Sequence, residues 1–327
     1  MNVRSVTRIR LRSDYQSLLL GTAGAVVLLV LWNGGGYEQD LFTLSAVYAL
    51  IGLGVYVPYV LGGSLAMAYG AYAAIGAYAV ALVSVKTDLP IVLGWVAGPI
   101  AAAAIAVALG AATRRLSGFY LAAVTLLFGT AFETWLIDTE VVGGSLGFGG
   151  LRKLDLLGWE PNRFQMTVLA AVLVVAVAFA VDRIRLSPWG AVVRSMRDVP
   201  LAVESAGTRV PTLTLVALAV GAAIASLGGA LFATTRLGIT PETFTLHIVF
   251  LALFMPLIGG IGTPWGAVLG AVIVVKLTID FDALETSGTL VLALGVIVIL
   301  MVAPRGVIGY LDALRRQVLS RRGATDG

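Results

Sequence analysis

The sequence contains no cysteine, one histidine and only three lysines among its 327 residues. The absence of cysteine excludes disulfides, thiolate metal sites and cysteine nucleophiles. A single histidine, His247, excludes a histidine-based metal cluster within one chain. None of the lysines lies in the G-x4-G-K-[ST] pattern whose backbone and lysine hold nucleotide phosphates. We therefore expect no metal site, no cofactor and no catalytic residue in this chain.

Charge is equally scarce. Only 12% of the residues are charged and 59% are hydrophobic, whereas soluble domains are about a quarter charged and about 45–50% apolar. Several apolar runs reach the roughly 18–20 residues that cross a bilayer as a helix. The composition predicts an all-α, polytopic transmembrane bundle in contact with the lipid bilayer of the cell (plasma or inner) membrane. The basic residues fall between apolar runs, so they report orientation and indicate no nucleic acid.

The apolar runs predict about ten membrane spans in one transmembrane domain over residues 1–327. We place them at residues 17–32, 41–61, 64–83, 90–111, 118–137, 165–181, 211–235, 244–259, 264–279 and 288–303. The runs at 244–259 and 264–279 are either full crossings or a pair of half-helices. Alternating the spans puts 16 of the 22 lysines and arginines on one side. Positive charge marks the cytoplasmic side, so both termini are predicted to be cytoplasmic.

The stretch SPWGAVVRSMRDVPLAVESAG, residues 187–207, concentrates charge between two apolar runs. It belongs to a predicted cytoplasmic loop at about 182–210. Residues 190–196 and 200–206 each have the pattern of a short helix, with Asp198 as a cap and Gly207 as a stop. Helices this short are not stable alone, which suits docking on another protein. The alternative is a solvated loop.

Two glycine-rich features accompany this loop. The pattern G-x5-[YW]-G-A occurs twice, at residues 63–71 and 259–267. Transporters contain repeats whose glycine-interrupted helices face the substrate. The predicted outer segment at 138–165 contains VVGGSLGFGGL. It is either a docking or gating element or an ordinary loop.

Four segments resemble the permease subunits of ABC importers for branched-chain amino acids. Residues 187–207 are similar to that family's cytoplasmic loop, S-x-x-G-R-A-x-R-A-x-R-x-x-x-x-A-A-x-x-x-G. Residues 118–133, GFYLAAVTLLFGTAFE, are similar to its G-x-Y-x-A-x-x-T-L-x-F-G helix. Residues 238–271 resemble its I-x-P-x-x-F and G-G-x-G-[ST]-x-W-G-x-x-x-G-A segment, and residues 303–311, APRGVIGYL, match the end of its last helix. The resemblance covers most of the chain beyond residue 60.

The resemblance implies an importer permease that moves branched-chain or other hydrophobic amino acids inward by alternating access. It implies three partners: ABC ATPase subunits that hydrolyse ATP, a second related permease subunit and an extracytoplasmic substrate-binding protein. The loop at 182–210 would lie in a cleft of the ATPase and pass its motion to the membrane helices. The resemblance assigns this coupling role to Arg194, Arg197, Asp198, Glu204 and Gly207.

A small zwitterion crossing the bundle needs hydroxyls and apolar walls. The candidates for this substrate path are Tyr69, Tyr72, Thr125, Phe128 and Trp265, and the alternative for each is ordinary helix packing. The helix that ends in I-G-A-Y carries a histidine or glutamine near its start in the family. This sequence has Tyr69 there and Ala66 at a serine position. A path along this helix is expected to be more aromatic and less polar than in the family.

Other functions stay open at this point. Importers of urea or short amides have similar permeases. A channel or secondary transporter would not need the helices of residues 187–207, but coupled transporters usually keep a carboxylate near mid-membrane. Glu133, His247 and Lys276 lie near predicted outer ends, where they can snorkel to the interface. An integral membrane enzyme is disfavoured because no acidic or histidine cluster forms an acid–base pair.

Overall fold

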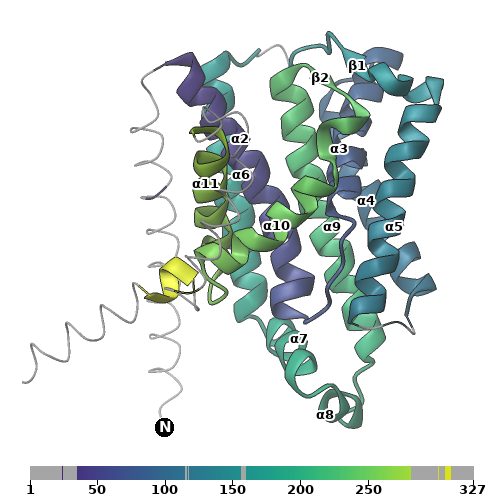
Figure 1. Cartoon of the computed structure of the whole chain (residues 1–327), viewed down its shortest axis with the longest axis vertical. Helices are drawn as coiled ribbons and strands as arrows, with labels where there is room; N and C mark the ends of the chain where they lie inside the picture. The colour runs from purple at the N-terminus through teal and green to yellow at the C-terminus, as the bar shows by residue number, and fades with distance from the viewer. Residues whose placement is uncertain are drawn as a thin grey trace, which may run out of the picture.

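The computed structural model describes residues 35–114, 118–155 and 160–280, together with residues 24, 116, 301 and 306–310. This part of the chain is a bundle of long helices with two very short strands (Figure 1). The elements are α2 (Gly36–Val55), the π-helix η1 (Tyr56–Leu61), α3 (Tyr69–Lys86), α4 (Val92–Ala112), α5 (Phe119–Asp138), η2 (Glu140–Val142), η3 (Gly144–Leu146), β1 (Phe148–Gly149), α6 (Arg163–Leu186), α7 (Pro188–Asp198), α8 (Pro200–Ser205), α9 (Val210–Arg236), β2 (Gly238–Ile239), η4 (Pro241–Phe244), α10 (Leu246–Gly259) and α11 (Pro264–Asp280).

Seven helices in the described part are long and apolar enough to cross a membrane. They cover 36–61, 69–86, 92–112, 119–138, 163–186, 210–236 and 241–259. A shorter apolar helix covers Pro264–Thr278. In lipid the backbone must satisfy its own hydrogen bonds, which is why these apolar runs form helices. The all-α bundle is confirmed. The first and last predicted spans, 17–32 and 288–303, lie outside the described residues, so ten spans and cytoplasmic termini stay predictions.

The helices divide into a buried centre and a periphery. In the most apolar 18-residue stretch of each helix, 83% of the residues are buried in α2 with η1, but only 22% are buried in α4 and in α5. Glycines of α9 let it lie directly on its neighbours. A Cβ at Gly229 would lie 1.8 Å from the carbonyl oxygen of Ala73, and one at Gly221 would lie 2.5 Å from that of Gly54. Such close backbone approach is how small residues hold membrane helices together.

The connection between η1 and α3 is not helical. Pro58 lies inside η1, where its missing N–H interrupts the helical hydrogen-bond ladder. The chain then runs without regular structure from Gly63 to Ala68, and α3 begins at Tyr69 rather than near residue 64 as predicted. Ala66 and Ala68 in this segment are 1% and 0% exposed. The unwound segment, residues 62–68, therefore leads from the exposed Gly63 into the protein interior at Ala66 and Ala68.

One end of the bundle, here called the β end, is closed by the segment that follows α5. Phe148 pairs with Ile239 and Gly149 with Gly238, so β1 and β2 join this segment to the end of α9. The Arg152 side chain donates to the carbonyl oxygens of Ser84, at 2.9 Å, and Thr87, at 2.7 Å. These bonds satisfy carbonyls at the end of α3. The described part of the predicted 138–165 loop is thus folded onto the bundle.

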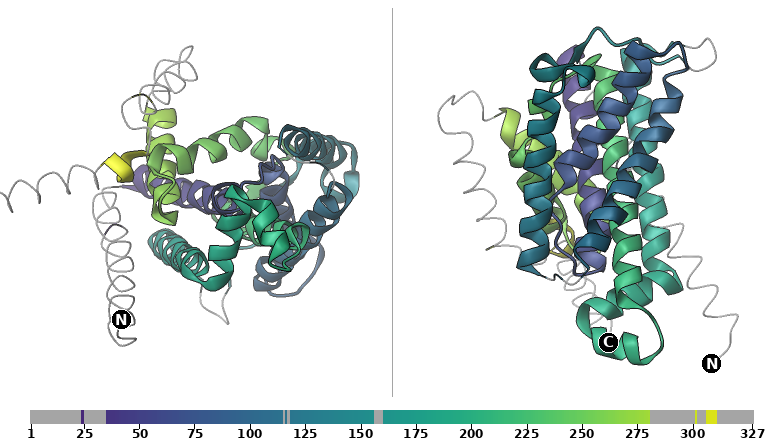
Figure 2. Two further views of the ribbon diagram at one scale, coloured as in Figure 1. Left: turned by 90° about the horizontal axis from the view of Figure 1, so that it is seen from below. Right: turned by 90° about the vertical axis from the view of Figure 1, so that its right-hand side faces the viewer.

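The opposite end, here called the α7 end, carries the helices α7 and α8. Both project below the long helices, which Figure 2 shows from below and from the side. This is the predicted loop at 182–210, and it does contain two short helices. Helix α10 crosses the bundle obliquely from the upper part of α3 toward α11 (Figure 1).

Candidate coupling surface and translocation path

The α7–α8 pair begins with a well-defined cap. The Ser187 hydroxyl accepts a hydrogen bond from the Gly190 amide at 3.1 Å, and Pro188 occupies the first helical turn. The prediction that Asp198 caps the second helix is wrong. Asp198 is the last residue of α7, and Val199 occupies the cap position of α8 without a side-chain bond. Gly207 has φ +84°, which fits its predicted role as a helix stop.

The inner face of α7 is attached to the bundle. Val193 and Met196 are 0% and 4% exposed. The Arg194 guanidinium donates to the Arg185 carbonyl oxygen at 2.9 Å, and the Arg197 guanidinium donates to the Val60 carbonyl oxygen at 2.6 Å. Both predicted coupling arginines therefore bond to this chain's own backbone. They hold α7 against α6 and η1.

The outer face of α7 and α8 carries the other predicted coupling residues. Asp198, Glu204 and Gly207 are exposed. Leu201 is 78% exposed and Val199 is 54% exposed between them. Sequence reasoning missed these two apolar residues because it followed charge alone. A groove of about 710 Å³ adjoins this face and is lined by Arg114, Glu204, Gly207, Thr208, Arg209, Pro211 and Thr212.

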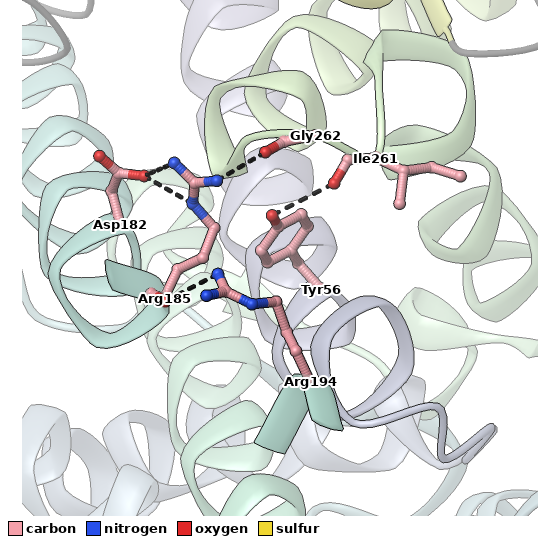
Figure 3. Close-up of polar contacts among 6 residues, drawn as sticks. All are labelled: Tyr56, Asp182, Arg185, Arg194, Ile261 and Gly262. Carbon is pink, nitrogen blue, oxygen red and sulfur yellow. Dashed lines mark hydrogen bonds and ion pairs between the residues drawn. The ribbon is translucent and has the colours of Figure 1, made fainter. Parts of the chain in front are cut away.

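A polar cluster joins the start of α7 to the turn between α10 and α11 (Figure 3). Arg185 forms a two-pronged ion pair with Asp182, with both guanidinium nitrogens 2.9 Å from Oδ1. A third nitrogen donates to the Gly262 carbonyl oxygen at 2.9 Å. The Tyr56 hydroxyl donates to the Ile261 carbonyl oxygen at 3.3 Å. Asp182 and Arg185 were not predicted, although a carboxylate with an arginine three residues later in a last helical turn is a pairing signal.

The unwound segment is held from α5. The Met67 amide donates to the Thr125 hydroxyl oxygen at 2.8 Å. That hydroxyl in turn donates toward the Leu121 and Ala122 carbonyl oxygens, at 2.8 and 3.0 Å. Because Thr125 is only 2% exposed, its oxygen satisfies a backbone amide that lipid cannot satisfy. The predicted path residue Thr125 is thus the support for the break before α3.

Tyr69 and Tyr72 lie in the first turn of α3, directly after this break. They are 0% and 1% exposed, and their rings pack edge to face with centroids 5.7 Å apart. The structure therefore brings Tyr69, Tyr72 and Thr125 to one place inside the bundle. Their burial against the core fits a place beside the path as well as ordinary helix packing.

The side of α5 that faces its neighbours forms a narrow groove. Phe128 stacks on Phe132, and Phe132 stacks on Trp135, with centroids 6.0 and 5.7 Å apart, but these three rings are not among the residues that line the groove. The groove leaves a cavity of about 10 Å³, room for one water molecule. Its lining combines α3, α5 and the start of α10, and consists of Met67, Gly70, Ala71, Leu126, Gly129, Thr130, Glu133, Phe244, Leu246 and Val249.

Trp265 lies apart from the other predicted path residues. It is half-buried at the start of α11 and packs against the apolar cluster that contains Tyr56, Val193 and Met196. That cluster is at the α7 end. His247 and Lys276, the other ionisable groups considered, are exposed in the described part of the chain. Within that part no group of histidine and acidic residues is arranged to hold a metal ion.

Comparison with known proteins decides the family. Residues 39–303 match the family described as branched-chain amino acid transport system / permease component. The chain belongs to this permease family. The permease is 31% identical over 319 residues to the high-affinity branched-chain amino acid transport system permease protein LivM of Escherichia coli (strain K12), which covers 88% of this chain and 73% of that protein. The predicted family is therefore confirmed.

Further relatives agree with this assignment. The LivM protein of Salmonella typhimurium (strain LT2) is 30% identical to the permease with the same coverage, 88% and 73%. The probable branched-chain amino acid transport permease protein LivM of Methanocaldococcus jannaschii is 28% identical over 150 residues, 44% of this chain and 42% of that protein. No solved structure gives a significant match. Together with the seven apolar helices, the family makes this chain a multi-pass protein of the cell membrane, as predicted.

Proposed function

We propose that this permease moves branched-chain or other hydrophobic amino acids inward across the cell membrane, driven by ATP that separate ABC ATPase subunits hydrolyse. The observation that carries the proposal is the α7–α8 pair in a chain of this family. It is anchored by Arg194 and Arg197 on its inner face and exposes Leu201 on its outer face. A rigidly attached projection with an exposed apolar tip suits a socket on a partner.

The proposal places the α7 end in the cytoplasm and the β end outside. Support comes from the arginines of the α6–α9 connection, because positive residues favour the cytoplasmic side. Asp198, Leu201, Glu204 and Gly207 would contact the ATPase, whereas Arg194 and Arg197 would hold α7 to the bundle. Loop 182–210 is then the coupling segment of a single permease domain. The folded β end would receive the extracytoplasmic substrate-binding protein.

The substrate path would follow the groove between α3, α5 and α10. Its apolar side chains suit a branched hydrocarbon, and Glu133 supplies a carboxylate for an ammonium group. The broken helix before Tyr69 presents a helix N-terminus, which in transporters faces anionic groups of the substrate. The cavity is far smaller than an amino acid, so α5 must move away from α3 to admit one. This describes a closed stage of alternating access.

The peripheral position of α5 supports the second permease subunit as its partner. Little of this helix is buried inside the subunit, yet it carries Glu133, an ionisable group that is unfavourable against lipid. A second permease subunit would cover this group and complete the path. Tyr69, Tyr72, Thr125 and Phe128 do not line the groove in this closed stage, and they would border the path only after α5 moves away from α3. Trp265 would act only at the cytoplasmic end.

The test is to purify the permease complex under conditions that retain partners and to identify the co-purifying chains by mass spectrometry. We expect ATPase subunits, and we expect Leu201→Asp to reduce their recovery about tenfold or more, since a charge at a buried contact costs over 1.4 kcal/mol. The matched control is Leu146→Asp, which alters an equally exposed leucine, 87% exposed, at the β end. Recovery should be unchanged in that variant.

The competing functions give different results. A channel or secondary transporter would show uptake in vesicles without ATP and would be indifferent to Leu201→Asp. An importer of urea or short amides would retain its ATPase but fail to bind leucine through its substrate-binding protein. Leucine uptake that depends on ATP inside the cell is the result that the proposal requires.

A further inference from the structure

The junction between α6 and α7 is bonded to a part of the chain far from it in sequence. The Arg185 guanidinium reaches the Gly262 carbonyl oxygen at 2.9 Å, in the turn at residues 260–263 between α10 and α11 (Figure 3). Tyr56 bonds to the neighbouring Ile261 carbonyl oxygen from η1. The turn is thus held from two sides at the same end of the bundle that carries α7.

The ion pair with Asp182 determines where Arg185 points. Asp182 is 1% exposed, and its Oδ1 atom lies 2.9 Å from two guanidinium nitrogens. The guanidinium is planar, so a group fixed on one edge aims its remaining N–H bonds in a set direction. A buried carboxylate without its partner is strongly unfavourable, which opposes release of Arg185.

The same junction is bonded to α7. Arg194 on α7 donates to the Arg185 backbone carbonyl at 2.9 Å, and the Ser187 hydroxyl caps the start of α7. The last turn of α6, the first turns of α7 and the Arg185 side chain therefore form one hydrogen-bonded unit. A displacement of α7 displaces the guanidinium that holds Gly262.

On the other side, the turn is rigidly connected to α10. A Cβ at Gly259 would lie 1.8 Å from the Gly266 carbonyl oxygen, and one at Gly270 would lie 1.9 Å from the Met255 carbonyl oxygen. The ends of α10 and α11 are therefore in backbone contact and must move together. Helix α10 has 14 residues, about 21 Å at 1.5 Å per residue.

The far end of α10 borders the groove. A Cβ at Gly70, in the first turn of α3, would lie 2.7 Å from the Phe244 carbonyl oxygen and 3.2 Å from a Val249 methyl carbon. Phe244 and Val249 line the groove together with Met67. A shift of α10 along or across its axis must therefore change the groove beside the unwound segment.

We infer that Arg185 is a positioning residue that carries the movement of α7 to the α10–α11 turn, so that α10 shifts against the first turn of α3. The inference rests on the proposed function, since it needs an ATPase that moves α7. It assigns to the Asp182–Arg185 pair the role of linking ATP hydrolysis to the groove. Arg185 touches no substrate in this role.

The first test uses the complete importer, purified through this subunit and reconstituted in liposomes. The variant is Asp182→Asn with Arg185→Gln, which removes both charges and leaves no buried charge unpaired. We expect ATP hydrolysis to stay within about twofold of the unmodified importer, while leucine imported per ATP falls about tenfold. The control is Lys276→Gln, an exposed residue of α11 outside the coupling segment, which should leave both values unchanged. An unchanged ratio of leucine to ATP in the double variant overturns the inference.

The second test does not depend on the variant folding. The chain has no cysteine, so spin labels attach only where Ser195→Cys and Gly262→Cys place them, with the partner subunits likewise free of reactive cysteines. We expect the distance between the labels to stay constant when ATP is added, although each label moves relative to α4. A change beyond the about 1–2 Å of ordinary helix adjustment overturns the inference. Absence of ATP-driven leucine uptake in the unmodified importer would instead refute the proposed function itself.

Discussion

Two segments of this permease share the pattern G-x5-[YW]-G-A but lie at different depths in the bundle. In both, a helix ends, a glycine-rich stretch follows, and a new helix begins beside the aromatic residue, Tyr69 in one and Trp265 in the other. Arg197 of α7 bonds to Val60, three residues before the first segment, and Arg185 at the end of α6 bonds to Gly262 in the second. Residues 63–71 then run into the buried interior. Residues 259–267 remain at the α7 end.

The difference comes from the neighbours and not from the pattern. The Thr125 hydroxyl on α5 accepts a hydrogen bond from the Met67 amide, so the first segment can be unwound inside the bundle. The second has its carbonyl groups held by Tyr56 and Arg185 near the surface. The shared pattern therefore specifies a helix start after a break, and side chains from other helices decide its depth. Four predictions test this comparison.

The largest effect is expected at the Asp182–Arg185 ion pair, which holds the second segment. Asp182→Ala leaves Arg185 without its buried partner and should cost about 3 kcal/mol, at the lower limit for such pairs because Arg185 reaches some water. Arg197→Ala, at the first segment, removes only a bond from an exposed side chain and should cost about 1 kcal/mol. The apparent melting temperature in detergent measures both. Equal decreases in melting temperature would contradict the distinction between the buried ion pair and the hydrogen bond of Arg197.

The next effect concerns the helices that follow the segments. A Cβ at Gly76 of α3 would lie 1.9 Å from the Ser226 carbonyl oxygen, the same distance as that from Gly270 of α11 to Met255. Replacing either glycine by alanine should cost about 2 kcal/mol, since overpacking of about 3 outweighs a gain of about 1 in helix propensity. Gly262→Ala, with no atom within 4 Å of its Cβ, is the control. If Gly76→Ala and Gly270→Ala melt at the same temperature as this control, the neighbouring backbone moves to admit the Cβ and the prediction is wrong.

A smaller effect is expected at the support of the first segment. Thr125→Val keeps the shape of the side chain but leaves the Met67 amide without its acceptor, which should cost about 1–2 kcal/mol. Thr125→Ser should retain most of the stability because it keeps the hydroxyl. Thr130→Val on the same helix removes an exposed hydroxyl that bonds only within α5, to Leu127. A larger decrease in melting temperature for Thr130→Val than for Thr125→Val would contradict the support role.

The smallest effect is expected for Tyr56→Phe. The bond from Tyr56 to Ile261 is long, at 3.3 Å, and its loss should cost about 0.5 kcal/mol. Leucine uptake should fall by less than in the Asp182–Arg185 double variant, because Arg185 still holds Gly262. A loss of uptake as large as in that variant would move the main link from Arg185 to Tyr56.

Several features of the fold were predictable from sequence because they depend on local chemistry. The apolar runs located the long helices to within a few residues, and Pro200 and Gly207 marked the start and stop of α8. Asp198 was assigned the wrong position since α7 continues two residues further than its pattern indicated. The start of α3 was placed five residues too early, because the break before Tyr69 depends on Thr125, 58 residues further along the chain.

The candidate site was less predictable. Arg194 and Arg197 were predicted as coupling residues, and only the structure shows that they bond to the backbone of α6 and η1. Leu201 was missed because one exposed leucine has no sequence signature. Trp265 was predicted to be an apolar wall of the same path as Tyr69, although it packs near Tyr56 at the α7 end.

The amino-acid sequence by itself determined that this chain crosses a membrane in many helices, lacks a nucleotide-binding loop and belongs with importer permeases, because hydropathy, missing residue types and short motifs are properties of the chain. Only the tertiary structure decided that Asp182, Arg185 and Gly262 meet, and that α10 connects their turn to the groove beside α3. Those contacts join residues about 80 positions apart, and such distances along the chain are closed by packing of glycine-lined helices, which no local pattern encodes.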